Sequence, residues 1–175
     1  MRNLILYIAS SLDGYIAAPG DDLKFLHLVQ KEGEDYGYSG FYESVDTVII
    51  GRKTYDWVVK EIGSSPHPDK TTYVITHKAR PAERNTIFYT GDMNDLVKRL
   101  KLEQGLNIFC DGGAEIVNEL QKNKLIDEMI ISVIPVLLGE GIRLFKDGRP
   151  GQNLVLLKSR QFDTGLVQLH YKCGD

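Results

Sequence analysis

Short, uninterrupted apolar runs alternate along the chain with segments of helical periodicity. The apolar runs occupy residues 4–9, 47–50, 72–76 and 106–110, and a longer run covers residues 129–138. Segments that are apolar throughout, rather than at every second position, are typical of strands buried on both faces of a parallel sheet. The pattern therefore predicts a central sheet that is mostly parallel.

Two amphipathic helices are predicted between and after these strands. Over residues 93–100, apolar side chains recur at helical spacing behind Asp92, which is a favourable N-cap residue. Residues 114–122 show the same periodicity, with three apolar side chains on one face. Helices that connect parallel strands are expected to cover the faces of the sheet.

The C-terminal part of the chain has a different pattern. Residues 154–157 and 166–171, joined across Asp163-Thr164-Gly165, predict an antiparallel hairpin. With 175 residues, of which 42% are hydrophobic, the chain is long enough for one full core and short for two. The predicted fold class is α/β, with a mostly parallel central sheet flanked by helices and an antiparallel C-terminal hairpin, in a single domain over residues 1–175.

Composition and charge argue against several classes of protein. The net charge of −3 disfavours nucleic-acid binding as the primary role, and the apolar runs are too short to span a membrane. Two cysteines give no disulfide framework and indicate a reducing compartment. The four histidines are scattered, without the spacing of a metal site. These features favour a cytoplasmic protein whose partner is a small molecule.

Three of the predicted strands end in residues suited to a nucleotide. In parallel sheets, ligands bind beyond the carboxyl ends of the strands. The residues at these ends are Gly51, Arg52, Lys53 and Thr54 at the first, Thr76, His77 and Lys78 at the second, and Asp111, Gly112, Gly113 and Ala114 at the third. The first and third turns each open a helix, where free N–H groups and the helix dipole attract phosphate. The cations exceed what a pyrophosphate needs, which favours NADP, with its 2′-phosphate, over NAD.

These turns match neither standard nucleotide-binding motif. The chain lacks GxGxxG and GxxxxGK[ST], which excludes Rossmann and P-loop sites. Residues 48–55, Val-Ile-Ile-Gly-Arg-Lys-Thr-Tyr, instead resemble the signature strand and helix start of the dihydrofolate reductase superfamily. Residues 11–17, 111–113 and 135–141 are similar to the C-terminal reductase domain of the bifunctional deaminase-reductase of riboflavin biosynthesis. The resemblance covers nearly the whole chain in the right order, as in a stand-alone single-domain member.

The resemblance implies an NADPH-dependent reductase of a small heterocyclic or carbonyl substrate, similar to 5-amino-6-(5-phosphoribosylamino)uracil reductase. Carried over by position, the implied cofactor contacts are Ala9 and Ile16 at the nicotinamide, Gly51, Arg52, Lys53 and Thr54 at the phosphates, Thr76, His77 and Lys78 at the adenosine end, and Gly112, Gly113, Ala114 and Glu115 at the pyrophosphate. The resemblance also implies a cis peptide bond between Gly112 and Gly113. It further implies a homodimer formed through C-terminal strands, for which residues 129–138 are sufficiently apolar.

The chain departs from the riboflavin enzyme in two respects. The zinc deaminase half is absent, with neither HxE nor PCxxC. The arginines that hold the substrate phosphate are also missing, because residues 17–50 contain two lysines as their only cations and residues 58–70 contain no arginine. Positive charge there would have to come from Lys60, from Lys70 or from a partner subunit.

Dihydrofolate reductase itself places a carboxylate early in the helix before the Gly-Arg motif. Counting back without gaps reaches Asp35, in the polar, glycine-containing segment at residues 34–38. Such a segment predicts a capping or solvated carboxylate rather than a helical active-site residue. A dihydrofolate reductase proper is therefore disfavoured.

Hydride transfer requires close placement of the nicotinamide and a source of a proton, but no covalent nucleophile. Asp13, and then Asp111, are the candidates for polarising the substrate or orienting a water, since burial at the strand ends would raise their pKa. A local alternative for Asp13 is the capping of a tight turn. Tyr15, Phe25 and Tyr55 are candidates for an aromatic wall against a planar substrate, and core packing explains Tyr55 equally well.

A second class of function stays open at this point, namely a non-catalytic nucleotide-binding or interaction module on the same scaffold. The intact phosphate-binding turns favour the reductase, whereas the missing arginines leave room for the module. An open apolar pocket between Ala9, Ile16 and Asp111 would favour the reductase, and a filled one would favour the module.

Overall fold

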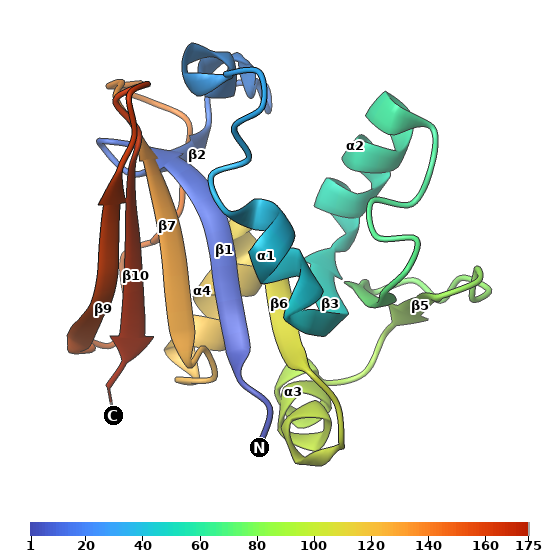
Figure 1. The fold of residues 1–175 in the computed structure, drawn as a ribbon. Coiled ribbons are helices and arrows are strands. Elements are labelled where there is room, and N and C mark those ends of the chain that lie inside the picture. Colours follow the sequence, from blue (N-terminus) through green and yellow to red (C-terminus); the bar gives the residue numbers. More distant parts are fainter. Residues whose placement is uncertain (175) are drawn as a thin grey trace.

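The centre of the structure is one eight-stranded sheet, whose strands come from the N-terminal, middle and C-terminal parts of the chain (Figure 1). The structure is a computed structural model and describes residues 1–174. In the order in which they lie across the sheet, the strands are β5 (Thr86–Tyr89), β4 (Thr71–Ile75), β3 (Val45–Gly51), β6 (Asn107–Gly112), β1 (Leu4–Ser11), β7 (Glu128–Ile134), β10 (Val167–Cys173) and β9 (Leu154–Gln161). Two short strands, β2 (Tyr15–Ala17) and β8 (Ile142–Arg143), form a separate ribbon.

Across this sheet of the described residues, the strands β5, β4, β3, β6, β1 and β7 run parallel to one another, and only β10 and β9 are antiparallel to their neighbours. In Figure 1, β9 lies at one margin of the sheet and β5 lies toward the other. The predicted α/β arrangement, with a mostly parallel central sheet and an antiparallel C-terminal strand pair, is confirmed.

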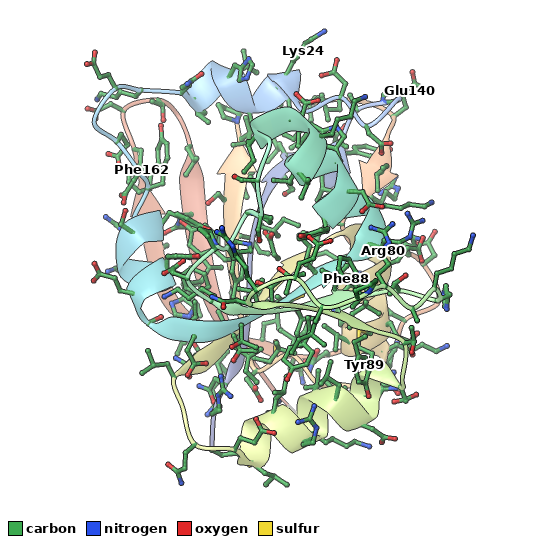
Figure 2. The ribbon with its side chains drawn as sticks, turned by 90° about the vertical axis from the view of Figure 1, so that its right-hand side faces the viewer. Lys24, Arg80, Phe88, Tyr89, Glu140 and Phe162 are labelled. Atoms are coloured by element: carbon green, nitrogen blue, oxygen red, sulfur yellow. The ribbon has the colours of Figure 1, made fainter. Side chains whose placement is uncertain are left out.

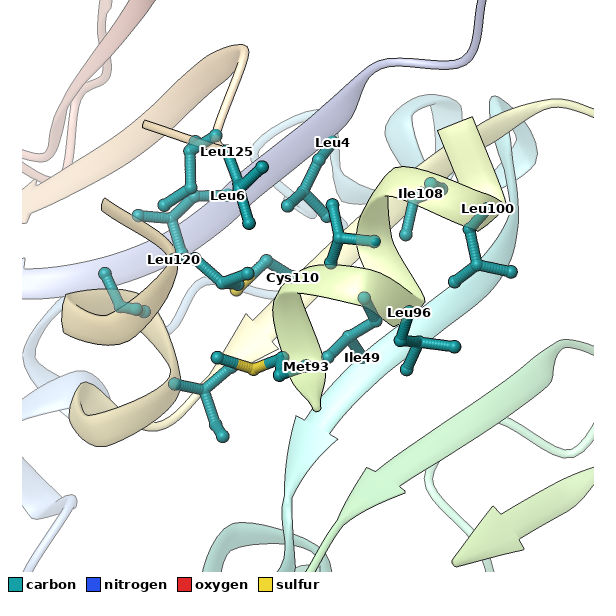
Figure 3. Close-up of a cluster of buried hydrophobic side chains, with 14 of the residues drawn as sticks. Leu4, Leu6, Ile49, Met93, Leu96, Leu100, Ile108, Cys110, Leu120 and Leu125 are labelled. Carbon is teal, nitrogen blue, oxygen red and sulfur yellow. The ribbon is translucent and has the colours of Figure 1, made fainter. Parts of the chain in front are cut away.

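Helices cover both faces of the sheet. They are the 3-10 helix η1 (Lys24–Val29) and the α-helices α1 (Tyr38–Glu43), α2 (Arg52–Ile62), α3 (Met93–Leu102) and α4 (Ala114–Lys122). On one face, α3 and α4 pack against Leu4, Leu6 and Ile108 (Figure 3). On the opposite face, α1 and α2 pack through Phe41 and Tyr55. Both faces of the central strands are therefore covered, which explains their continuous apolar sequence.

The two helices predicted from periodicity form where expected. The Asp92 carboxylate caps α3 and accepts hydrogen bonds from the N–H groups of Asn94 and Asp95 at 2.8 and 2.9 Å. α4 covers the predicted residues 114–122 and buries its apolar face. No helix within residues 1–174 is long and apolar enough to span a lipid bilayer.

The strands differ from the prediction mainly in the C-terminal part. β7 ends at Ile134 rather than at residue 138, because Pro135 has no N–H to donate to a neighbouring strand. β7 also lies between β1 and β10, so it has no free edge through which a dimer could form. β9 continues to Gln161, beyond the predicted end at residue 157. The hydropathy pattern did not predict β5, η1 or α1, whose segments are too short to show a period.

Candidate functional site

The turns after β3 and β6 lie in direct contact. The two strands are parallel neighbours, so they end at the same edge of the sheet. A Cβ atom added to Gly51 would lie 3.1 Å from Cγ1 of Ile116 and 3.6 Å from the carbonyl oxygen of Gly112. A Cβ atom added to Gly113 would lie 2.9 Å from Oγ1 of Thr54. Neither glycine can carry a side chain without displacing a neighbour.

Two helix N-termini begin at these touching turns. α2 begins at Arg52 and α4 at Ala114, and neither N-terminus has a side-chain cap from residues 1–174. The first N–H groups of a helix have no partner inside the helix, so they are available to an anion. The Gly112–Gly113 peptide bond is cis, as the resemblance implies. Glu115, in the first turn of α4, is paired with Lys146, which balances the one carboxylate at this end of the helix.

A pair of arginines is held beside the first of these turns by Asp56. Its carboxylate accepts a hydrogen bond from Arg52 at 2.8 Å and two from Arg80 at 2.8 and 3.1 Å. The hydrogen bond from Arg80, and then that from Arg52, lowers the pKa of Asp56. The Arg80 guanidinium lies over the Phe88 ring, 5.2 Å from its centroid (Figure 2). Asp56 was not among the predicted site residues, although its i,i+4 spacing from Arg52 indicates an ion pair on one helix face.

The other cationic residues predicted for phosphate binding remain exposed near this pair. Lys53, His77 and Lys78 are exposed. Thr76 is buried, and its hydroxyl accepts a hydrogen bond from the N–H of Lys78 at 3.1 Å, which fixes the turn after β4. The donors gathered here suit an anion. By contrast, residues 1–174 contain no group of three or more His, Cys, Asp or Glu side chains that could hold a metal ion.

An open cavity of about 460 Å³ lies beside β1, on the sheet face that α1 covers. Ala9, the predicted nicotinamide neighbour, lines it. The other lining residues belong to the sheet, to the segment from η1 to α1 or, for Leu166, to the turn before β10, and they are Tyr7, Leu26, His27, Val29, Gln30, Lys31, Glu34, Asp35, Tyr36, Tyr38, Ser132, Ile134 and Leu166. The sequence analysis missed most of this wall, because an irregular segment gives no periodic signal.

A pocket between Ala9, Ile16 and Asp111 was predicted to distinguish a reductase from a non-catalytic module, and one of these three residues lines the observed cavity. Ala9 lines it, but neither Ile16 nor Asp111 does. Ile16 packs against the core cluster that α3 and α4 form with the sheet. The space next to Ala9 is therefore open, but it extends toward η1 and α1 rather than toward Ile16.

The three aromatic residues proposed as a substrate wall lie in separate packing clusters. Tyr15 is 8% exposed, and its hydroxyl donates a hydrogen bond to the carbonyl oxygen of Gly139 at 3.1 Å. Phe25 is buried among residues of η1, β7 and the C-terminal hairpin. Tyr55 packs edge-to-face with Phe88, with 5.7 Å between ring centroids. No common wall is formed, because each ring is already covered by its own neighbours.

Asp13 has the opposite ionisation behaviour from the one predicted. Its carboxylate accepts hydrogen bonds from the Ser11 hydroxyl at 2.5 Å and from the N–H groups of Leu138 and Gly139 at 3.1 and 2.7 Å. These bonds, chiefly the one from Ser11, lower the pKa of Asp13 to about 2. The prediction of a raised pKa is wrong, because local donors stabilise the carboxylate more than burial destabilises it. Asp13 ties the loop after β1 to the loop after β7.

Asp111 forms a pair with a histidine that the sequence analysis did not select. His67 Nε2 lies 3.0 Å from Oδ2 of Asp111, and the His67 side chain is 4% exposed. A carboxylate only accepts, so Nε2 is the donor, and the buried Nδ1 has no partner within residues 1–174. Burial, and then the charge of Asp111, raises the pKa of Tyr38, which lines the cavity. Asp111 is therefore close enough to influence the cavity wall electrostatically.

Asp35 lines the cavity but acts as a cap. Its carboxylate accepts hydrogen bonds from the N–H groups of Gly37 at 2.8 Å and Ser39 at 3.0 Å, at the start of α1. Hydrogen bonding from the Ser39 hydroxyl, followed by the backbone donors, holds the pKa of Asp35 below its ordinary value. The predicted capping role is confirmed.

We expect replacement of Asp13 by asparagine to lower the thermal unfolding temperature at neutral pH, because the charged acceptor of three hydrogen bonds is lost. The folded-state pKa of about 2 lies below the ordinary value of 3.8. The stabilisation is therefore present above about pH 4 and is lost as the pH falls toward 2. The difference in unfolding temperature between wild type and Asp13→Asn should shrink over that interval.

Circular dichroism melts between pH 7 and pH 2 measure this difference. Asp21→Asn is a matched control, because Asp21 is exposed and accepts no side-chain hydrogen bond from residues 1–174. A difference between wild type and Asp13→Asn that stays constant across the whole range would contradict the assignment.

The chain matches the family model described as the RibD C-terminal domain over residues 2–168. It is 44% identical over 171 residues to the uncharacterized protein YwjB of Bacillus subtilis (strain 168), with 97% of each chain covered. A solved structure from Shewanella sp. PV-4, described as that of a riboflavin biosynthesis protein, superposes with a TM-score of 0.89. Its sequence identity is 30%, and 99% of each chain is covered.

A more distant similarity connects the chain to folate enzymes. Dihydrofolate reductase from Enterococcus faecalis, solved in complex with NADP(H), superposes with a TM-score of 0.69 at 17% identity. The superposition covers 99% of this chain and 97% of that one. At this identity the similarity shows the fold alone, and that fold is dihydrofolate-reductase-like. Since the family model spans nearly all of its length, the chain belongs to the RibD C-terminal domain family.

Proposed function

We propose that the protein is an NADPH-dependent reductase, working as a single domain in the cytoplasm. The observation that carries the proposal is the contact between the glycine turns at Gly51 and at Gly112–Gly113. It brings the uncapped N-termini of α2 and α4 to one point of the sheet edge. Family membership supports a reductase of this type.

The residues at this point fit a nucleotide with several phosphates. The missing Cβ atoms leave the backbone N–H groups open to close approach. Arg52 and Arg80 are fixed by Asp56, while Lys53 and Lys78 remain exposed beside them. Two fixed guanidinium groups and two ammonium groups exceed what a pyrophosphate requires, which supports a cofactor with a 2′-phosphate. Bound NADPH would supply the hydride.

The substrate would occupy the 460 Å³ cavity beside Ala9. Its ionisable lining includes Lys31 and His27 together with Glu34 and Asp35, so it has no excess of positive charge at neutral pH. This lining favours a small uncharged heterocyclic or carbonyl compound over a phosphoribosyl compound with its phosphate in the cavity. The reaction would otherwise resemble that of 5-amino-6-(5-phosphoribosylamino)uracil reductase.

We assign the handling of the proton to Asp111 rather than to Asp13. The carboxylates of Asp13 and Asp35 are occupied as acceptors of backbone hydrogen bonds, and both have lowered pKa values. The Asp111 side chain is partly exposed, and its carboxylate accepts a hydrogen bond from the buried His67. In this proposal Asp111, which does not itself line the cavity, acts on the substrate through a water that it orients near Tyr38, and the buried His67 positions the Asp111 carboxylate.

The two rival functions receive less support. A scaffold that had lost its chemistry would be expected to fill the pocket between Ala9, Ile16 and Asp111; of these three residues Ala9 alone lines an open space, which supports the reductase at that position only. A dihydrofolate reductase proper would use the Asp35 carboxylate, which here caps α1. Both observations favour a reductase of the riboflavin type.

We also propose that the protein is a homodimer formed through β9. All eight residues of this outermost strand are exposed, and Leu154, Val155, Leu156 and Leu157 are 43–58% exposed. An edge strand whose first four residues are exposed and apolar is an unusual surface for a monomer, because its free N–H and C=O groups invite another strand. Antiparallel pairing of two β9 strands about a two-fold axis would satisfy both edges at once.

We expect NADPH to bind at least tenfold more tightly than NADH. We expect Arg52→Gln to weaken NADPH binding by about tenfold, or about 1.4 kcal/mol. The reason is the loss of one fixed guanidinium beside the α2 N-terminus. Fluorescence of Trp57, the single tryptophan and a residue of α2, follows the titration.

Lys60→Gln is the matched control for charge, because Lys60 lies in the last turn of the same helix. It should leave NADPH affinity unchanged. Absence of binding by either cofactor to the wild-type protein would refute the reductase proposal. Equal weakening by Arg52→Gln and Lys60→Gln would refute the assigned phosphate site.

We expect a solution mass of twice the 19.7 kDa chain, and a shift to the monomer in a Val155→Lys/Leu157→Lys variant. Like charges facing each other across a paired edge oppose association. Light scattering after size exclusion measures the mass. Leu102→Lys, at a 77% exposed position on α3, is the control and should remain dimeric. A monomeric wild type, or a dimer in the double variant, would exclude β9 as the interface.

A further inference from the structure

A second concave site lies between α1 and the C-terminal hairpin. It is distinct from the touching turns at Gly51 and Gly112–Gly113, here called the cofactor cleft. The second site is a cavity of about 140 Å³, here called the hairpin pocket, and it is lined by Lys158, Arg160 and His170 together with Tyr7 and Ile130. In the sheet register, Lys158 pairs with His170, His170 with Ile130, and Ile130 with Tyr7. Neighbouring strands therefore bring these side chains together on one face of the sheet.

The lining of the hairpin pocket contains two cations, Lys158 and Arg160, and no carboxylate. Neither Lys158 nor Arg160 forms an ion pair with any of residues 1–174, whereas His170 Nε2 lies 2.7 Å from the Glu128 carboxylate. Of the other groups near the pocket, the Asp35 carboxylate is bonded to backbone N–H groups of α1. Two cations thus face one concave surface, and both carboxylates already have other hydrogen-bond partners and lie outside its lining.

The exposed head group of Arg160 lies close to Gly37 and to one aromatic ring. Gly37 has φ of 82°, and a Cβ atom there would lie 2.9 Å from Nη1 of Arg160. The guanidinium also lies over the Phe162 ring, 5.1 Å from its centroid. Glycine at position 37 therefore allows the positive φ angle of the backbone there, and it leaves space for the Arg160 guanidinium at the rim of the pocket.

A polar partition separates the hairpin pocket from the cavity beside Ala9. Nε2 of Gln168 lies 3.1 Å from the Tyr7 hydroxyl, 3.1 Å from the carbonyl oxygen of Tyr36 and 3.2 Å from the Ser132 hydroxyl. Gln168 lines the hairpin pocket, Tyr36 and Ser132 line the other cavity, and Tyr7 lines both. The hairpin pocket is therefore a separate site.

We propose that the hairpin pocket binds the phosphate group of a small phosphate monoester, with Lys158 and Arg160 as the anion-binding residues. Its volume corresponds to about four or five water molecules at about 30 Å³ each, enough for a phosphate and a few attached atoms. Guanidinium and ammonium groups are the usual partners of phosphate. The stacked rings of Tyr7 and Phe41, with centroids 4.6 Å apart, offer an apolar surface to the organic part. This inference is independent of the reductase proposal.

The simplest competing explanation is that Lys158 and Arg160 only protect an exposed edge strand from aggregation. Glycine-selective ¹⁵N NMR separates the two explanations, because Gly37 lines the pocket while Gly51, Gly112 and Gly113 report on the cofactor cleft. Phenyl phosphate is the main probe, and inorganic phosphate is the second. We expect both to shift the Gly37 resonance, and phenyl phosphate to bind at least threefold more tightly.

We expect the Lys158→Gln/Arg160→Gln variant to weaken phenyl phosphate binding at Gly37 by at least tenfold. Lys172→Gln, which removes a lysine of β10 outside the pocket, is the matched control and should bind like wild type. Thermal melts establish that each variant is folded. An unshifted Gly37 resonance, or equal affinity in the double variant and wild type, would overturn the anion site. Equal affinity for the two probes would overturn the role of the aromatic rings.

Discussion

The contact between two glycine turns is the constraint on which the rest of the candidate site depends. α2 and α4 can begin at the same point of the sheet edge only because Gly51 and Gly113 carry no Cβ atom. Ile116 of α4 lies against Gly51 and also belongs to the main core cluster. The packing that buries α4 therefore also aims its N-terminus at the start of α2, so core and site are set by the same contact.

Asp13, Asp35 and Asp111 show how the surroundings of a carboxylate decide its role. Asp13 accepts hydrogen bonds from a hydroxyl and two backbone N–H groups, and Asp35 accepts two backbone N–H bonds at the start of α1. These bonds stabilise the charged form, which makes each residue a fixed acceptor. Asp111 instead faces one buried imidazole, His67, and keeps part of its surface exposed. That environment leaves capacity for a ligand or a water.

Much of the fold could be predicted from the chain, because continuous apolar runs and helical periodicity are local signals. They located β1, β3, β4 and β6, the bounds of α4 and the Asp92 cap of α3. The glycine turns were also visible, since a strand end followed by glycine and a helix is a local pattern. The early end of β7 follows from Pro135, because proline has no N–H to donate. This end could have been predicted by treating proline as a strand terminator despite the apolar residues that follow it.

The parts of the site that were missed depend on contacts between distant residues. His67 lies in a loop, 44 residues from its partner Asp111, and nothing in its local sequence indicates the pair. The pKa of Asp13 is lowered chiefly by the nearby Ser11 hydroxyl, but the two backbone N–H groups that add to this effect lie about 125 residues further along the chain. The cavity wall between η1 and α1 is irregular and therefore carries no period. Topology, rather than composition, creates these features.

The most direct test of the account is a titration of glycine-labelled protein with NADPH, followed by ¹⁵N NMR. If the touching turns hold the cofactor phosphates, the resonances of Gly51, Gly112 and Gly113 will shift or broaden most. Gly63, at the opposite end of α2, will change least. Binding that leaves the three turn glycines unchanged and perturbs another part of the molecule would contradict the account.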